Sequence, residues 1–363
     1  MVFSKKRILA VGILLLVIVK IYAYTHMDLS TMFIPKEIDH ELNHLLNDRN
    51  KAILKEDEMA LQSFYDQDIK YGRWAYEHEV KKMKYLHKWS KKQGVRFIDI
   101  VPDVDIRWIK EKGDGFVANL VVSTEYKYEY EEEEETENVN SFRIGTYHSI
   151  YLKETDEGIK ITREWYTDPF ADSLHMEDVK TEKIKEYILA QKKRDFSNLG
   201  ERIKEAVKYA DEYCGAAGID NRKYNKKYRN YNPLGGDCAN FASQILYEGG
   251  KFRKNSTWNY GRGATKAWVN AHGFKDYMIY SGRASVIAHG TYESIYKASY
   301  KLKPGDFVAY EKKGKVTHIS VVTGADSKGY SLVNCHNTDR YRVPWDLGWS
   351  NKGIKYWLVH VHF

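Results

Sequence analysis

A cysteine stands where a glycine-rich loop is predicted to turn into a helix. Gly235 and Gly236 precede Asp237 and Cys238, and apolar residues recur at helical spacing from Phe241 onward. The unpaired N–H groups at a helix N-terminus carry roughly half a positive charge, which favours a thiolate over a thiol. The pattern predicts a nucleophilic Cys238 with a lowered pKa, the alternative being a buried structural cysteine. Asp237 is expected to cap the helix.

A candidate base for this thiol lies on an alternating segment further along the chain. Residues 316–324 alternate in a way that predicts a strand with His318 on one face. A second strand is expected over 330–336, and it would bring Asn334 and His336 to one face. A cysteine, a histidine base and a polar group that orients the histidine can together carry out acyl transfer. We therefore expect His318 to be the base and either His336 or Asn334 to orient it.

This arrangement resembles the "putative amidase domain" family of the papain-like cysteine hydrolase clan, which also contains cell-wall hydrolases of the NlpC and CHAP kinds. The resemblance covers about residues 198–363. The matching segments follow in the family's order, namely Tyr231-Asn232-Pro233, residues 236–244 and 249–250, Trp268, and residues 303–308, 318–324 and 336–340.

The resemblance implies a papain-like α+β fold, in which a helix packs on an antiparallel sheet, with Cys238 as nucleophile and His318 as base. Family members usually carry histidine at the position of His336, whereas Asn334 has the spacing from the base that is found in papain. Asn232 is a candidate oxyanion donor, because papain-type enzymes often place a glutamine there. No cofactor and no metal site is expected, since the cysteines form no C-x-x-C pair.

The N-terminus has the features of a targeting segment. Lys5-Lys6-Arg7 precede an uninterrupted apolar run over 8–19. Such a pattern is typical of a signal peptide or a membrane anchor, here over residues 1–24. In either case the positive-inside rule predicts that the remainder of the chain is extracytoplasmic, either secreted or membrane-anchored.

A second unit is predicted between this segment and the amidase domain. Helical periodicity over 36–92 followed by a run of strands indicates a smaller α+β accessory domain over 34–170, loosely similar to cystatin-like or SnoaL-like cone domains. A helical linker over 171–197 is expected to lead into the amidase domain at 198–363. The predicted strands of the accessory domain cover 95–101, 116–128, 141–152 and 158–166.

Composition narrows the choice of partner. The chain is 43% hydrophobic and 29% charged, as globular proteins are, and its net charge of +7 suits an anionic cell-wall or membrane surface. No nucleic-acid-binding motif is present in the sequence, so no nucleic acid partner is expected. The membrane is an expected partner only if the N-terminal segment stays uncleaved.

The sequence thus predicts an extracytoplasmic cysteine amidase or peptidase that cleaves a peptide-type amide bond, with cell-wall peptidoglycan as the substrate. Two alternatives stay open. One is a papain-like module that binds wall peptides without cleaving them. The other is an acyltransferase that uses the same pair, Cys238 and His318.

Overall fold

The computed structural model describes residues 36–363 apart from 132–137, 172–180, 220–221, 262 and 350–352. The predicted hydrophobic segment at 1–24 lies outside these residues. Within the described ranges, no helix combines the length and the apolar character that a membrane crossing requires.

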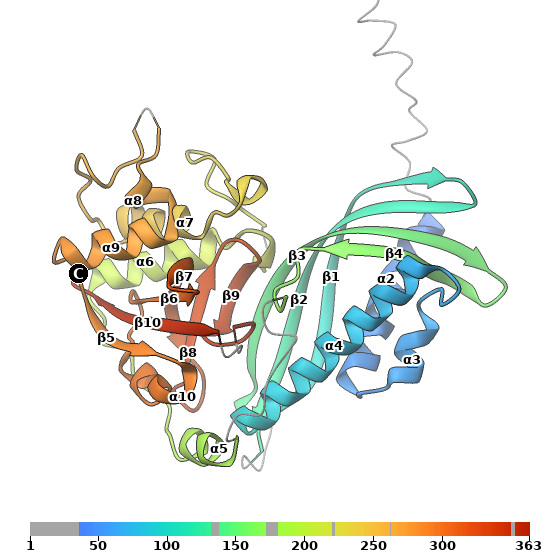
Figure 1. Cartoon of the computed structure of the whole chain (residues 1–363), viewed down its shortest axis with the longest axis horizontal. Coiled ribbons are helices and arrows are strands. Elements are labelled where there is room, and N and C mark those ends of the chain that lie inside the picture. The colour runs from blue at the N-terminus through green and yellow to red at the C-terminus, as the bar shows by residue number, and fades with distance from the viewer. Residues whose placement is uncertain (1–35, 132–137, 172–180, 220–221, 262, 350–352) are drawn as a thin grey trace, which may run out of the picture.

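Helices followed by strands make up the first part of the chain (Figure 1). They are α2 (Lys36–Leu54), α3 (Glu58–Ser63), α4 (Lys70–Gln93), β1 (Val95–Lys112), β2 (Gly115–Tyr130), β3 (Asn140–Thr155) and β4 (Gly158–Tyr166). Each predicted strand is present, and β1 is longer than expected because it pairs with β2 along its whole length. Gly72 lets α4 begin against the sheet, since a Cβ there would lie 2.2 Å from the carbonyl oxygen of Asp66.

The second part of the chain begins with short helices and ends with a run of strands, with α10 between the first two strands. Its helices are α5 (Thr181–Leu189), α6 (Glu201–Glu212), α7 (Cys238–Gln244), α8 (Lys266–Val269), α9 (Ala271–Tyr280) and α10 (Tyr292–Ile295), and α7 continues into the π-helical turn η5 (Ile245–Gly249). Its strands are β5 (Ala284–Gly290), β6 (Phe307–Lys312), β7 (Lys315–Ala325), β8 (Ser331–Cys335), β9 (Asp339–Pro344) and β10 (Ile354–Val361). The predicted α+β class, a mixture of helices and antiparallel sheet, is confirmed.

One sheet runs through both parts of the chain. Among the described residues it has ten strands in the order β1-β2-β3-β9-β8-β7-β6-β10-β5, with β4 beside β3. The two parts join where β3 pairs with β9, and Figure 1 shows these strands side by side. At this joint Gly145 is opposite Asp339, and a Cβ on Gly145 would lie 2.3 Å from the backbone of Ala216. A side chain at this position would push the two parts apart.

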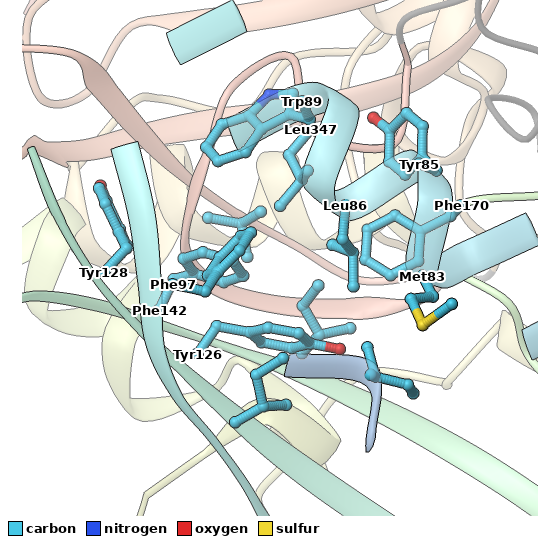
Figure 2. Packing of buried hydrophobic residues seen from close by; sticks show 14 of the residues in the cluster. Met83, Tyr85, Leu86, Trp89, Phe97, Tyr126, Tyr128, Phe142, Phe170 and Leu347 are labelled. Carbon is cyan, nitrogen blue, oxygen red and sulfur yellow. The ribbon is translucent and has the colours of Figure 1, made fainter. Parts of the chain in front are cut away.

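The hydrophobic core is continuous across this joint. Figure 2 shows Trp89 and Leu86 of α4 packed near Leu347, which follows β9. A buried ion pair lies in the same region, where Nζ of Lys92 is 2.5 Å from Oδ2 of Asp346. The accessory domain and the amidase domain that were predicted as separate units therefore share one core.

A second core holds the helix that begins at Cys238. On the side of β6, β7 and β10 that faces α6, α7 and α9, buried apolar residues pack together, among them Phe241, Phe274, Phe307, Ile319 and Val321. This packing places the N-terminus of α7 beside β7. The predicted helix after Gly236 and the predicted strand around His318 are thus adjacent elements.

Candidate active site

Cys238 is the first residue of α7 and is only 6% exposed. It follows Gly235 and Gly236, whose φ angles of 110° and 135° are conformations that glycine adopts at little cost. The backbone N–H groups of Ile319 and Ala239 approach the thiol and stabilise its thiolate, but burial outweighs them and raises the pKa of Cys238 to about 12. The predicted lowering of this pKa is therefore absent from the structure.

His318 lies on β7, opposite Tyr310 of β6, and is 1% exposed. Its ring is flanked by two aromatic rings, with centroid distances of 5.4 Å to Tyr310 and 4.9 Å to Trp349. Burial and the positive charge of Arg340 lower the pKa of His318 to about 3, so the imidazole is neutral at physiological pH. Its Nε2 atom is buried and accepts no hydrogen bond from any residue that the structure describes.

The thiol of Cys238 approaches the backbone of β7 next to the predicted base, but the two side chains face different sides of the strand. Ile319 and Val321 pack with Cys238 in the second core, whereas His318 alternates to the other face, where it meets Tyr310 and Trp349. The N–H group that approaches the thiol of Cys238 belongs to Ile319, the residue directly after His318. No hydrogen bond joins the thiol to the imidazole within the described part of the chain. Each of the two groups is buried and neutral, and the structure holds no preformed pair of thiolate and imidazolium.

His336 is bound on both of its ring nitrogens, and neither partner is His318. Its Nδ1 lies 2.6 Å from Oδ2 of Asp237 and its Nε2 lies 2.7 Å from the carbonyl oxygen of Tyr213. Both partners are acceptors, so both nitrogens donate and the ring is an imidazolium. Burial lowers the pKa of His336. The hydrogen bond to Asp237 and the negative charges of Asp339 and Asp237 raise it by more, so the pKa lies above its ordinary value. The ring also stacks on Phe241, with centroids 3.7 Å apart.

Asp237 organises the loop in front of Cys238. Besides His336, its carboxylate accepts hydrogen bonds from the backbone N–H of Tyr231 at 3.0 Å and from Nδ2 of Asn240 at 2.8 Å. It accepts no backbone N–H of α7, so the predicted capping role is wrong. The acidic side chain thus links its own loop to the Asn240 side chain of α7 and to His336 after β8.

Asn334 points to the other side of the sheet from His318. It is in register with Val321, and residues 318 and 321 of one strand face opposite sides. Its Oδ1 accepts hydrogen bonds from the Thr323 hydroxyl and the Arg342 N–H, both at 2.8 Å, and its Nδ2 donates to Asp211 at 2.9 Å. In the structure neither Asn334 nor His336 orients the His318 ring.

Asn232, the predicted oxyanion donor, lies in the 3₁₀ turn η4 (Asn232–Leu234). Its Nδ2 donates to the Tyr224 hydroxyl at 3.4 Å, and its Oδ1 is buried without a partner among the described residues. The structure gives it no hydrogen bond to Cys238. A donor role for Asn232 stays a prediction.

Sequence reasoning missed the residues that surround His318. Tyr310 and Trp349 hold the ring by stacking, and Trp349 and Tyr310 stack on each other at 4.5 Å. No spacing rule links a tryptophan after β9 to a histidine on β7.

Comparison with known proteins finds similarity in the second part of the chain. Residues 200–359 match the family described as "Putative amidase domain". The "Uncharacterized protein YjcM" of Bacillus subtilis (strain 168) is 30% identical over 167 residues, which cover 43% of this chain and 36% of that protein. The chain therefore matches little more than a third of the length of this relative.

Solved structures were also compared. A structure of Bdellovibrio bacteriovorus Bd1075 has 20% identity and a TM-score of 0.22, covering 35% of this chain and 39% of that one. An NTF-2 like protein of unknown function from Shewanella oneidensis MR-1 has 12% identity and a TM-score of 0.22, covering 37% of this chain and 98% of that one. The assignment of the second part of the chain comes from the family match: residues 200–359 form an amidase-like domain.

Proposed function

We propose that the amidase-like domain hydrolyses an amide bond through a thioester on Cys238, with His318 as the base. The observation that supports the proposal is the contact between the thiol and the backbone N–H of Ile319, the residue that follows the predicted base in the sequence. The family match at residues 200–359 supports an amide as the bond that is cleaved.

The proposed reaction has two balanced steps. The thiol proton passes to His318 as the sulfur attacks the carbonyl carbon, and the C–N bond then breaks as His318 returns the proton to the leaving amine. Water next attacks the thioester as His318 accepts its proton, the C–S bond breaks to release the acid, and the proton on His318 returns to the sulfur. The N–H of Cys238 is the first candidate donor to the oxyanion, and Asn232 is the second.

Burial sets the charge state in which this reaction starts. A lone thiolate or a lone imidazolium is costly in this site, since the pKa of Cys238 is raised to about 12 and that of His318 is lowered to about 3. Proton transfer from one to the other creates both charges together, so that each offsets part of the other's desolvation. We therefore infer that the thiolate forms only as the substrate arrives.

His336 and Asn334 have positioning roles in this proposal. His336 acts on Cys238 through Asp237, which fixes the loop before α7, and Asn334 ties β8 to Arg342. The ring of His318 is oriented by Tyr310 and Trp349 through packing, where other enzymes of this chemistry use a hydrogen bond.

Peptidoglycan is the proposed substrate, and an extracytoplasmic location is proposed with it. Support comes from the signal-like pattern at residues 5–24, the resemblance to cell-wall hydrolases and the net charge of +7. The accessory part at 34–170 and the amidase part at 198–363 are proposed to act as one body, because they share a core.

The test compares three forms of the full chain on purified peptidoglycan and on short peptide amides, with products identified by mass spectrometry. The wild type and Cys214→Ala should release the same products, while Cys238→Ala should release none and keep its circular dichroism spectrum. Cys214 is the matched control because it is a buried cysteine outside the site. Activity in Cys238→Ala would refute the proposed nucleophile.

A non-hydrolytic binding module is the second candidate, and the neutral state of the resting pair favours it. Wild-type chain that binds wall peptides, releases no product and forms no acyl adduct with an activated ester would establish this candidate instead. An acyltransferase would form the adduct but pass it to an added amine in preference to water.

A further inference from the structure

A cleft of about 370 Å³ lies between the start of α4 and the end of β4, outside the amidase-like domain. Its volume is at the lower end of the range of ~300–1,000 Å³ for small-molecule sites. Its lining residues are Tyr71, Trp74, Ala75, His78, Arg163, Glu164, Trp165, Tyr166, Asp168 and Ala171. We call it the Trp74–Trp165 cleft.

Three aromatic rings are exposed around this cleft to an extent that is unusual for such residues. Trp165 is 62% exposed, Trp74 is 52% exposed and Tyr71 is 51% exposed. Tyr71 and Trp74 meet edge to face at 5.6 Å, so their positions are fixed relative to each other. Large exposed aromatic surface that is held in place rather than buried is typical of a binding site.

The floor of the cleft is rigid and its charges are already satisfied. Glu164 accepts hydrogen bonds from Arg49 and from His148, both at 2.8 Å, and the Tyr166 hydroxyl donates to Glu79 at 2.5 Å. These groups point inward to buried partners. They hold the rim residues in place and are not themselves available to a ligand.

Of the polar groups at the rim, Asp168 is already engaged, since its Oδ1 accepts the Phe170 N–H and its Oδ2 faces His78. Asp168 lies 2.8 Å from Nε2 of His78 at the edge of the cleft. The Arg163 guanidinium lies 5.1 Å from the Tyr71 ring and has no carboxylate partner among the residues that the structure describes. Lys70 adds a second cation, 4.4 Å from the Trp74 ring. The rim thus combines exposed aromatic rings, the Asp168–His78 pair and the positive charge of Arg163.

We propose that the Trp74–Trp165 cleft binds a glycan that carries anionic groups. The C–H faces of sugar rings stack on aromatic side chains, their hydroxyls bind carboxylates and imidazoles, and an acidic substituent would pair with Arg163. A protein partner fits less well, because specific interfaces need about 800 Å² on each side and these rings are separated by charged groups. The inference rests on the proposed function. The accessory part of the chain would bind the glycan of the peptidoglycan whose peptides the amidase-like domain is proposed to cleave.

Glycan binding can be measured directly on the full chain carrying Cys238→Ala, which removes hydrolysis from the assay. Tryptophan fluorescence and calorimetry would be recorded with neutral N-acetylglucosamine oligomers and with peptide-free glycan strands that contain N-acetylmuramic acid. Trp74→Ala and Trp165→Ala should each weaken binding about tenfold or more. Arg163→Gln should weaken binding of the acidic glycan and leave the neutral oligomers unaffected.

Trp108→Ala is the matched control, because Trp108 is a partly exposed tryptophan on β1 that does not line the cleft. Unchanged affinity in Trp74→Ala and Trp165→Ala, or no affinity in the parent, would overturn the proposal. Self-association of the parent that both variants abolish would also overturn it, in favour of docking between copies of the chain.

Activity on glycan-free peptide amides separates this proposal from the proposed function. Trp74→Ala with an intact Cys238 should cleave such amides at the wild-type rate. If the wild type cleaves none while the glycan still binds, the amidase proposal fails and the cleft stands. If amides are cleaved and no glycan binds, the proposal for the Trp74–Trp165 cleft fails and the amidase proposal stands.

Discussion

Asp237 and His336 are 99 positions apart in the sequence, and their side chains meet at 2.6 Å directly beside the cysteine that begins α7. The contact ties the loop before the helix to the turn after β8. Because the ring is buried and charged, the geometry around Cys238 depends on an ion pair that titrates.

Stability should therefore depend on the protonation of His336. Its pKa in the fold is raised above the ordinary value of about 6.5, so its stabilising effect is complete below that pH and is lost as pH rises through the raised value. His336→Ala leaves Asp237 buried and unpaired and should lower the free energy of unfolding by about 3–5 kcal/mol at pH 6.

Urea unfolding at several pH values would measure this effect. The difference in free energy between the wild type and His336→Ala should shrink between neutral and alkaline pH. His360→Ala is the control, since His360 pairs with Asp306 at 2.9 Å with a half-exposed ring. A difference that does not change with pH would show that the ring is not charged in the fold.

Removing the ring that covers His318 should change its titration. Trp349→Ala lets water reach the imidazole, and the pKa of His318 should rise from about 3 toward the ordinary value. Proton NMR of the ring would follow the change. Trp357→Ala removes an equivalent stack, 3.8 Å from His289, and should leave His318 unchanged. A pKa that stays near 3 in Trp349→Ala would assign the shift to Arg340 instead.

The glycines before Cys238 offer a matched pair of substitutions. Gly235→Ala and Gly236→Ala both place a side chain at positive φ, and each should cost about 1–3 kcal/mol of stability. A Cβ on Gly236 would also lie 3.2 Å from Nδ2 of Asn337, whereas Gly235 has open space around it. We expect Gly236→Ala to lower kcat for peptide amides more than Gly235→Ala does. Equal kcat values would show that the contact with Asn337 does not affect the site.

The shared core predicts that the two parts of the chain unfold together. Asp346→Ala leaves Lys92 buried without its partner and should lower the free energy of unfolding by about 3–5 kcal/mol in a single transition that both parts follow. Asp48→Ala, which breaks the exposed pair with Lys51, should cost less than about 1 kcal/mol. Two separate transitions, or a stable fragment 198–363, would contradict this prediction.

Local signals predicted the elements of the site, and long-range register did not follow from them. The helix that begins at Cys238 and the strand that carries His318 are both present, because glycine turns and alternation are local properties. Which residue of β8 lies on the same face as His318 depends on the register between β7 and β8. In the structure Asn334 pairs with Val321 and so faces the opposite side from His318. Lys92 on an amphipathic helix would be assigned to the surface from sequence, and only the fold shows that Asp346 meets it in the core.

The joint between β3 and β9 also constrains how the chain reaches its native state. Lys92 and Asp346 are separated by 254 positions, so the core at this joint closes only after almost the whole polypeptide is available. Until then the backbone of β3 near Ile144 lacks its partner in β9, and the end of α4 around Trp89 lacks its contacts with Asp346. Such long-range contacts slow folding and expose hydrophobic surface in intermediates that are prone to aggregate. The first half of the chain would thus stay incompletely folded until the second half is synthesised, and refolding yields should fall steeply as protein concentration rises.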